Sequence, residues 1–476
     1  MNYSQKHPLY MRGSVKRAEA LDLYEGGARV EGNPAYLTRH PFENEKQWKI
    51  RQERATYRNF AAPIVDVFTS SICDGRPART LPAELEAMLG NVDRHGALAD
   101  VFFADVARLA AAGGSRFVLV DMEPAKGLTL AENDSAGRRN FPYFTAIDAD
   151  DVWDWGLDEA GLSWVVLHSL EIMEAMPFTA PSARDILTIW TRDEWRRLAS
   201  PPRPMDSSAL AGGFETMIED GRGAHPLGEV PVVPFLFEPV TPMTANPATD
   251  DVLSLILRIY RRDSELDKML FDCAVPLAIL NGVDKKLMDD FVRASSNVLA
   301  SEREDGVSGQ YLEPTGASYA ALREQIDADI ASVREIALRM VRPQSAVGER
   351  AEAKKIDKQQ LDTQLAGFAR RCASAERKCW ELAWKWLNNG RAPQADAIAC
   401  PYNEDYSVKD AERLDRQYLL EMLRIGAISR ETYLKLLLDM GCLPEGFDPE
   451  AEMSLLEMEE KGDTEAARKL REALAG

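Results

Sequence analysis

The chain has 476 residues, 45% hydrophobic and 28% charged, so it is long enough for about two to four compact units and is not expected to be disordered. Its 77 acidic and 57 basic residues give a net charge of −20, which argues against a protein that binds nucleic acid through a broad basic surface, although such a charge also serves solubility alone. No apolar run is long enough to cross a membrane and the N-terminus lacks the apolar stretch of a secretion signal, so we expect no membrane contact and a protein that stays in the cytoplasm.

The first quarter of the chain is predicted to be mainly helical. Residues 8–25 carry apolar residues at loose helical spacing and end at a Gly-Gly pair. A second helix is expected from about Glu43. Its continuation is apolar on most sides, is broken by Pro63 and stops at Gly75, which predicts a buried segment.

A helix and a series of strands are predicted next. The stretch ALADVFFADVARLAAAGG indicates a helix closed by two glycines, and SRFVLVDMEP indicates a buried strand. Further strands are expected at PYFTAID, SWVVLHSLEIM and DILTIWTRDEW, where β-branched and aromatic residues concentrate. Three prolines interrupt residues 225–239, which predicts an edge strand or an extended connector there. The N-terminal half is therefore predicted to be α+β.

Long helices dominate the sequence after Thr249. A helix of about 22 residues, roughly 33 Å long, is predicted over 250–272, and a second one over 317–341 has apolar residues every three or four positions. The insert 273–316 between them shows only a short apolar run and polar stretches. A third long helix is predicted from Ile356 to Asn388, and shorter helices are predicted towards the C-terminus.

Catalytic signatures are lacking. The sequence has no phosphate-binding loop, no nucleophile elbow, no HExxH and no dinucleotide-binding glycine motif. His168 lies in a strand pattern and is interpreted as a structural histidine, while His225 is interpreted as the cap of a turn. We therefore expect no enzymatic activity, no cofactor and no bound metal.

One group of side chains nevertheless resembles a divalent-cation site. It consists of four aspartates interleaved with two tryptophans: Asp148, Asp150, Asp151, Asp154, Trp153 and Trp155. Carboxylate oxygens suit such cations, but no histidine or nucleophile accompanies them, and an ordinary acidic turn beside buried tryptophans has the same sequence. A metal-dependent nuclease or hydrolase therefore stays open as an alternative.

The cysteines indicate neither disulfides nor a zinc site. They are spread over the chain without a CxxC pair: Cys73, Cys273, Cys372, Cys379, Cys400 and Cys442. Cys372 and Cys379 are two helical turns apart, so we expect both to be buried on one helix face.

Several segments, in chain order, resemble the portal (head-to-tail connector) proteins of tailed bacteriophages. The opening HPLYMRGSVKRAEALDLYEGG, the helix RATYRNFAAPIVDVFTSSICDGRP and the segments HGALADVFFADVARLAAAGGSRFVLVDMEP and YFTAIDADDVWDW resemble that family. The most specific piece is HPLGEVPVVPF followed by the helix that ends RDSELDKMLFDCAVPLAILNG. QYLEPTGASYAALREQIDADI and IGAISRETYLKLLLDMGCLP complete a resemblance over nearly the whole chain.

The resemblance implies a portal fold with a fixed order of parts. These are an α+β wing (1–249), a first stem helix (250–272), a clip (273–316), a second stem helix (317–341), a tunnel loop (342–355), a long wing helix with a strand (356–408) and a short helical crown (409–476).

It also implies three functional surfaces. The tunnel loop would face DNA through Arg342, Arg350, Lys354 and Lys355. The second stem helix would line the channel with Glu324, Asp327 and Asp329. The clip would contact terminase or an adaptor through Lys285, Lys286, Arg293 and Arg303. For the tunnel loop, ordinary solvated charges partly paired with Glu349 and Glu352 remain an equal alternative.

In that family, twelve subunits form a ring at one capsid vertex of the virion, assembled in the host cytoplasm. Double-stranded DNA would pass through non-specifically, and a ring of twelve such chains would carry a charge of about −240 that repels DNA from a wall. The implied partners are the terminase motor, the major capsid protein and head-tail adaptors. A helical adaptor or scaffold protein without a DNA channel is the other alternative.

Overall fold

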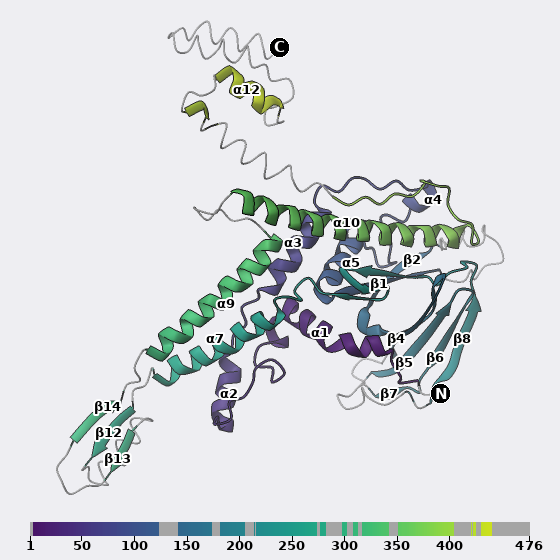
Figure 1. Ribbon diagram of the computed structural model, residues 1–476. Coiled ribbons are helices and arrows are strands. Elements are labelled where there is room, and N and C mark those ends of the chain that lie inside the picture. Colours follow the sequence, from purple (N-terminus) through teal and green to yellow (C-terminus); the bar gives the residue numbers. More distant parts are fainter. Residues whose placement is uncertain are drawn as a thin grey trace, which may run out of the picture. The chain divides into compact units, whose positions relative to one another are not determined.

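The computed structural model of the chain describes most of the first 400 residues and a few beyond them. The described residues are 3–122, 141–173, 181–204, 214, 216–273, 277–281, 298–301, 308–312, 317–341, 351–403, 420, 422–424 and 430–439. The chain divides into two units, Met1–Glu404 and Asp405–Gly476. The described part is α+β, as the sequence predicts (Figure 1).

Helices make up about half of residues 3–122. They are α1 (Pro8–Glu25), the 3-10 turn η1 (Gly27–Arg29), α2 (Glu45–Arg54), α3 (Ala61–Cys73), α4 (Ala83–Glu86) and α5 (Ala99–Gly113). A capping box between Asn44 and Gln47 begins α2. The expectation of a helix broken at Pro63 is wrong in its detail. The break lies at residues 55–60, and Pro63 falls in the first turn of α3, where a missing N–H is tolerated.

A three-stranded antiparallel sheet with the order β2-β1-β9 follows α5. Its strands are β1 (Ser115–Asp121), β2 (Tyr143–Asp148) and β9 (Val232–Leu236). The prediction of an edge strand within 225–239 is confirmed, because β9 pairs with β1 alone among the described strands and places Pro234 opposite Phe117. Gly114 joins α5 to β1 at φ +88°, and a Cβ there would overlap the backbone of Ala245, so only glycine fits this turn.

A second, larger antiparallel sheet has the order β3-β4-β5-β6-β8. Its strands are β3 (Val152–Asp158), β4 (Gly161–Met173), β5 (Ser182–Thr191), β6 (Glu194–Ala199) and β8 (Ile218–Ala224), with β7 (Arg203–Pro204) also paired to β5. A 3-10 turn, η2 (Ala149–Asp151), connects β2 to β3, and the short hairpin β10 (Glu238–Thr241) and β11 (Thr244–Asn246) follows β9. The strands predicted at 142–148 and 163–173 are confirmed, whereas the segment 185–195, predicted as one strand, is divided by a bend at 192–193 between β5 and β6, which pair as a hairpin.

Aromatic side chains join the helices to the first sheet. Phe103 of α5 contacts Phe144 of β2 and Phe235 of β9, and Phe144 meets Trp380 of the long helix α10 edge to face. These rings are at most a few per cent exposed. Because such pairs bury large apolar areas, they hold α5 and α10 against this sheet.

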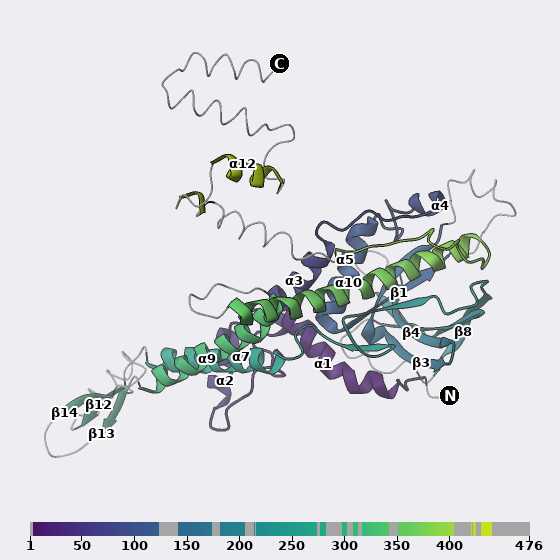
Figure 2. The same ribbon diagram turned by 45° about the horizontal axis from the view of Figure 1, so that its top comes forward.

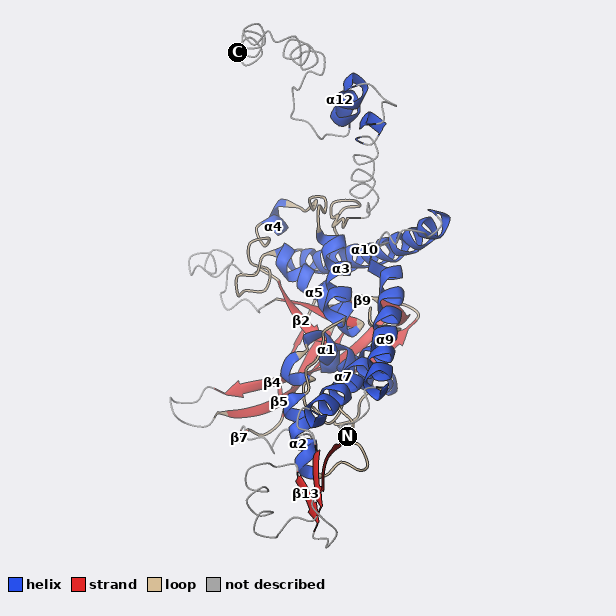
Figure 3. Cartoon of the chain, turned by 90° about the vertical axis from the view of Figure 1, so that its left-hand side faces the viewer, coloured by secondary structure: helices blue, strands red, loops and turns tan. Residues whose placement is uncertain are grey.

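Two long helices lie side by side in all three views (Figure 1, Figure 2 and Figure 3). They are α7 (Leu253–Cys273) and α9 (Ala317–Val341). The first begins three residues later than predicted, because Asp250 pairs with Lys16 of α1 and residues 249–252 form turns. Ile326, Ile330 and Val333 of α9 are buried, as the apolar spacing predicts.

The insert between α7 and α9 contains a small sheet that the sequence did not indicate. Its strands are β12 (Leu277–Asn281), β13 (Val298–Ser301) and β14 (Ser308–Leu312), in the order β13-β12-β14. β12 pairs with β13 in parallel and with β14 in antiparallel fashion.

The third long helix, α10, spans Ala351–Leu387. It begins five residues before the predicted Ile356, so Lys354 and Lys355 belong to a helix and not to a loop. In the second unit, the structure describes α12 (Arg430–Asp439), which confirms one of the predicted C-terminal helices; the others lie outside the described residues. No helix among the described residues is long and apolar enough to span a membrane.

Candidate functional site

Asp329 pins the two long helices to each other. Its side chain is only 8% exposed, and its carboxylate accepts hydrogen bonds from Arg258 at 2.6 and 3.0 Å and a further one from Arg262. The two arginines are four residues apart on α7, so they present their guanidinium groups on one face. The charge cluster therefore fixes the register between α7 and α9.

This position corrects one predicted channel residue. Asp329 lies inside the helix pair and cannot line a channel, because two arginines of α7 enclose its carboxylate. Glu324 and Asp327, the other two predicted residues, are exposed on α9. Their exposure is compatible with a position on a channel wall, and their contact with DNA stays a prediction.

The first turns of α7 are anchored to the N-terminal part of the chain. Tyr260 is 1% exposed; its hydroxyl accepts a hydrogen bond from the Gly32 N–H at 2.9 Å and donates one to the Val30 carbonyl at 3.1 Å. Its ring meets that of Tyr57 edge to face. One side chain of α7 thus makes hydrogen bonds with two backbone groups of the segment after α1.

Substituting Tyr260→Phe should lower the free energy of unfolding by about 1–2 kcal/mol, because the partly buried Gly32 N–H loses its partner and the buried Val30 carbonyl keeps only its hydrogen bond from the Asn33 N–H. Urea unfolding would measure the change. Tyr36→Phe is a suitable comparison, because the Tyr36 hydroxyl makes a single hydrogen bond, to Asp22. An equal effect of both variants would contradict the special role of Tyr260.

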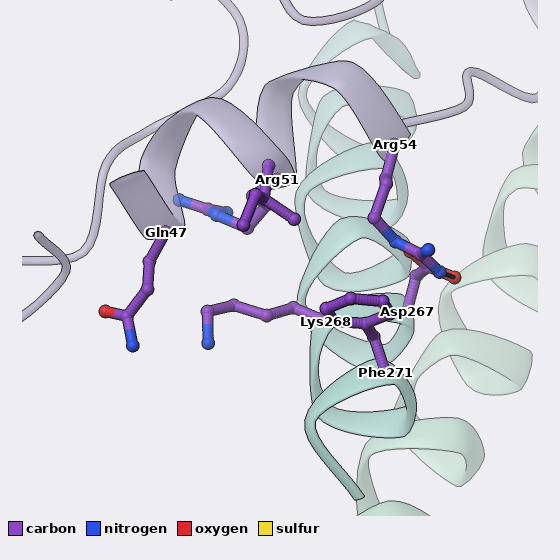
Figure 4. A pocket seen from close by; sticks show the side chains of 7 residues that line it. Gln47, Arg51, Arg54, Asp267, Lys268 and Phe271 are labelled. Carbon is purple, nitrogen blue, oxygen red and sulfur yellow. Dashed lines mark hydrogen bonds and ion pairs between the residues drawn. The ribbon is translucent and has the colours of Figure 1, made fainter. Parts of the chain in front are cut away.

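Helix α2 and the segment after it bind the next turns of α7 through charge pairs, one from Arg54 at the end of α2 and one from Arg58 beyond it. Arg54 binds Asp267 through two hydrogen bonds of 2.9 and 3.1 Å, and Arg58 binds Asp263 through two of 2.7 Å. Figure 4 shows Arg54 reaching Asp267 and Lys268 extending past Arg51 towards Gln47. The cavity between these side chains is about 30 Å³, enough for a water molecule but not for a cofactor.

A buried carboxylate ties α10 to the segments before α4 and after α10. Glu376 is fully buried and accepts hydrogen bonds from Arg76 at 3.1 Å, from Arg79, and from the Tyr402 hydroxyl at 2.6 Å. Burial, together with the neighbouring Glu376, raises the pKa of Tyr402 well above its usual value, so this hydroxyl stays a proton donor. Because the two arginines surround the carboxylate, its negative charge is compensated although it is buried away from water.

The basic residues predicted to touch DNA or terminase cannot be placed as side chains. Arg342 and Arg350 lie outside the described residues, and the structure places only the helical backbone of Lys354 and Lys355. The predicted clip contacts also fall outside the described residues: Lys285, Lys286, Arg293 and Arg303. These assignments remain predictions.

The four aspartates of the possible cation site point to different partners. Asp150 binds Arg17 at 2.9 Å, Asp148 pairs with Arg116, Asp151 contacts His168 at 3.3 Å, and Asp154 accepts a hydrogen bond from the Trp155 N–H. In the part of the chain that the structure describes, no three His, Cys, Asp or Glu side chains are grouped as a cation site. The acidic turn beside tryptophans is therefore the better interpretation.

His168 is a structural histidine held between two carboxylates. Its Nδ1 lies 3.3 Å from Asp151 and its Nε2 lies 3.0 Å from Asp185, while its ring stacks on Trp153 at 4.4 Å. Arg203 binds the same Asp185 at 2.6 Å. Burial alone would lower the pKa of His168, but its hydrogen bonds to the two aspartates outweigh burial, so the pKa is raised.

The raised pKa predicts a pH-dependent contribution to stability. The protonated His168 should stabilise the fold fully below the unfolded pKa of about 6.5, and this contribution should be lost as pH rises through the higher folded-state pKa. Urea midpoints of the wild type and of His168→Gln at pH 6 and at pH 8 would test this. The difference between the two proteins should shrink at pH 8, and a constant difference would contradict it.

His225 and the cysteines also fill structural roles. His225 is buried between Trp190 and Trp386, and its Nε2 contacts the Thr191 carbonyl at 3.1 Å, so it packs in a core and does not merely cap a turn. Cys372 and Cys379 are buried on α10, as predicted. Burial raises the pKa of both thiols, which makes them unreactive.

Comparison with protein families gives one match, which covers the long helices. A family described as a domain of unknown function, DUF4055, matches residues 251–387, the stretch from the start of α7 to the end of α10. No curated protein matches the chain.

Two solved structures, both described as necks of GTA particles, are similar to the chain at low identity. The neck of an empty GTA particle computed with C6 symmetry is 12% identical, with a TM-score of 0.34, and the match covers 86% of this chain and 96% of that one. The neck of a native GTA particle computed with C12 symmetry is 13% identical, with the same TM-score and coverage. Likenesses at this TM-score do not establish a shared fold.

Proposed function

We propose that this chain is the portal subunit of a tailed phage, forming a ring of twelve at one capsid vertex through which double-stranded DNA is packaged and ejected. One observation carries the proposal. Two long helices, α7 and α9, lie side by side. A small sheet lies between them in the sequence, and the longer α10 begins nine residues after α9. This order is the stem, clip and wing plan that the sequence resemblance implies.

The connections within the first unit support a role in bearing load. The Asp329 cluster locks α7 to α9, and Tyr260, Arg54 and Arg58 lock α7 to the N-terminal part. A helix pair that must stay rigid while DNA passes requires such cross-links, because packing alone allows helices to slide. The exposed Glu324 and Asp327 would then repel DNA from the channel wall.

On this proposal the chain has no catalytic activity of its own, and a separate terminase supplies the energy for packaging. Terminase and later the head-tail adaptors would dock on the small sheet and its connections, and the major capsid protein would surround the ring in the virion. The basic residues at the start of α10 and before it would touch DNA transiently.

Negative-stain imaging of the purified protein tests the proposal. Rings with a central hole of the width of duplex DNA are expected, together with loss of packaged DNA from particles that lack the protein. A monomer with metal-dependent nuclease activity would favour the hydrolase alternative, and a small closed oligomer without a hole would favour an adaptor or scaffold protein.

Replacing Arg342, Arg350, Lys354 and Lys355 together by glutamine tests the DNA-facing assignment separately. If these residues contact DNA, filled particles should lose DNA retention while ring formation stays unchanged. Unchanged retention would show that the charges are only solvated.

A further inference from the structure

A phenylalanine in the segment before α2 is almost fully exposed. The Phe42 side chain is 91% exposed, more than any other large apolar side chain of the described residues, and Pro41 beside it is exposed as well. Single exposed apolar residues are common on protein surfaces, so exposure alone does not indicate a binding site. The conformation of the surrounding segment and the charge next to it are what distinguish this position.

The segment around this side chain, residues 38–44, is held in one conformation, and we call it the tip. The side chains of Glu43 and Arg51 are 2% and 4% exposed and are joined by hydrogen bonds of 2.9 and 3.0 Å. Arg51 also donates to the Thr38 carbonyl at 2.5 Å, and Arg39 donates to the Glu43 carbonyl at 2.8 and 3.0 Å. A buried ion pair adds little net stability, but it fixes the path of the chain that surrounds it.

An exposed aromatic side chain on a rigid segment is suited to anchor an interface. Aromatic residues are frequent among those that contribute most to protein–protein binding. A segment that is already ordered loses little conformational entropy on binding, so more of the contact energy becomes affinity. The His40 ring lies 5.6 Å from the Phe42 ring and restricts it further. The tip therefore has the properties of a preformed contact.

The helix that follows the tip is basic, although the chain has a net charge of −20. Helix α2 contains four basic and two acidic residues. Its two arginines are bound to carboxylates of the same chain. Lys46 and Lys49 are exposed and make no ion pair with the described residues. Because the chain is strongly acidic, the surface of another copy supplies the carboxylates that these lysines attract.

The position of α2 suits a contact between copies in a ring. Helix α2 lies on the side of α7 that is turned away from α9 (Figure 1 and Figure 3) and is bound to α7 through Arg54. Copies in a closed ring are related by rotation, so one surface of each copy meets a different surface of the next. A rigid apolar projection beside positive charge is one half of such a contact.

We propose that the tip and α2 bind a second copy of this chain. Phe42 would pack against apolar side chains of that copy, and Lys46 and Lys49 would lie beside its carboxylates. Duplex DNA is a poorer occupant, because two lysines make few phosphate contacts and DNA offers no apolar partner for the ring. The inference rests on the proposed function, since the ring supplies the second copy, and it adds the segment through which copies bind.

Replacing the aromatic ring tests the anchor. Phe42→Ala should weaken the association of copies at least about tenfold in sedimentation velocity, because the ring is the apolar centre of the contact. Val15→Ala is the control: Val15 is 75% exposed on α1, away from the tip in sequence, and its substitution should leave association unchanged. Equal weakening by both variants would overturn the proposal. Urea unfolding should give the same midpoint for both variants, since both side chains are exposed.

Reversing charges on α2 tests the sign of the partner surface. The double variant Lys46→Glu and Lys49→Glu should weaken association, whereas Glu53→Lys, on the same helix, should strengthen it at low ionic strength. The opposite order of the two effects would rule out contact with carboxylates and overturn the proposal.

Photocrosslinking identifies the occupant. Benzoylphenylalanine is placed at position 42, and chains with and without ¹⁵N labelling are mixed before assembly and irradiation. Crosslinked peptides that join a labelled to an unlabelled chain are expected; crosslinks within single chains alone would contradict the proposal.

The outcomes also separate this inference from the portal assignment. Rings with a central hole that Phe42→Ala does not weaken would overturn the inference and leave the portal assignment intact. A small closed oligomer that Phe42→Ala dissociates would support the inference and overturn the portal assignment. A wild-type protein that stays monomeric at all concentrations would overturn both.

Discussion

Replacing Glu376 by alanine is expected to lower the free energy of unfolding by about 3–5 kcal/mol, the largest effect of any single substitution considered for this chain. Glu376 is fully buried on α10 and accepts hydrogen bonds from Arg76, Arg79 and Tyr402. Removing its carboxylate would leave two largely buried guanidinium groups, whose other carboxylate partner among the described residues is the exposed Asp100. Removing one partner of a buried ion pair costs more stability than the pair contributes, because the remaining charged side chains stay buried without a counter-charge.

The urea midpoint of unfolding measures this effect, and Glu381→Ala is the matched control. Glu381 lies on the same helix and pairs with Arg377 at 2.8 Å, but Arg377 is more than half exposed, so its loss should cost less than about 1 kcal/mol. Glu376→Gln should fall between the two, since it keeps part of the hydrogen bonding but not the charge. If Glu376→Ala and Glu381→Ala shifted the midpoint equally, the buried cluster would not carry the stability that its geometry implies.

The spacing of apolar residues and the positions of glycine and proline were sufficient to predict the helices that lie on the surface of the first unit. The apolar spacing of α9 and the proline after it predicted both of its ends, and the Gly-Gly pair predicted the end of α1. The predicted helix break at Pro63 was wrong. A proline can either break a helix or occupy its first turn, and the path of the chain before the proline decides between the two.

The contacts that hold the parts together could not be predicted, because their partners are far apart in sequence. Glu376 meets Arg76 and Arg79 across about three hundred positions, and a sequence contains many acidic and basic residues that could pair equally well. The place of β2 at the end of the described order β2-β1-β9 could not be predicted for a similar reason, because strand order depends on the whole fold.

Asp329 is a case in which the sequence did contain the signal. Ile326, Asp329 and Val333 are separated by three and four residues, so Asp329 shares the buried face of α9, whereas Asp327 does not. Grouping Asp329 with the exposed acidic residues ignored this spacing. The four-residue spacing of Arg258 and Arg262 on the preceding helix indicated where its partners lie.

Substituting Asp329→Asn should therefore destabilise the helix pair by about 2–3 kcal/mol, less than the loss of Glu376, because half of the Arg258 side chain is exposed and solvent screens its charge. Asp327→Asn, two residues earlier on the exposed face, is the matched control and should change stability by less than about 0.5 kcal/mol. Hydrogen exchange at the amides of α7 and α9 would localise the effect.

A double-mutant cycle with Arg262→Gln decides whether the charge cluster acts as one unit. If Asp329 acts through its arginines, its substitution should cost clearly less when Arg262 is already neutral, because one of the two ion pairs that it loses is then absent. If the stability effects of the two substitutions were strictly additive, Asp329 would not act through Arg262. The register of the helix pair would then depend on the apolar contacts of α9 alone, those of Ile326, Ile330 and Val333. In the proposed ring, the same variant should also weaken the rigidity of the stem, so rings that form with Asp329→Asn should dissociate at lower urea concentration than those formed with Asp327→Asn.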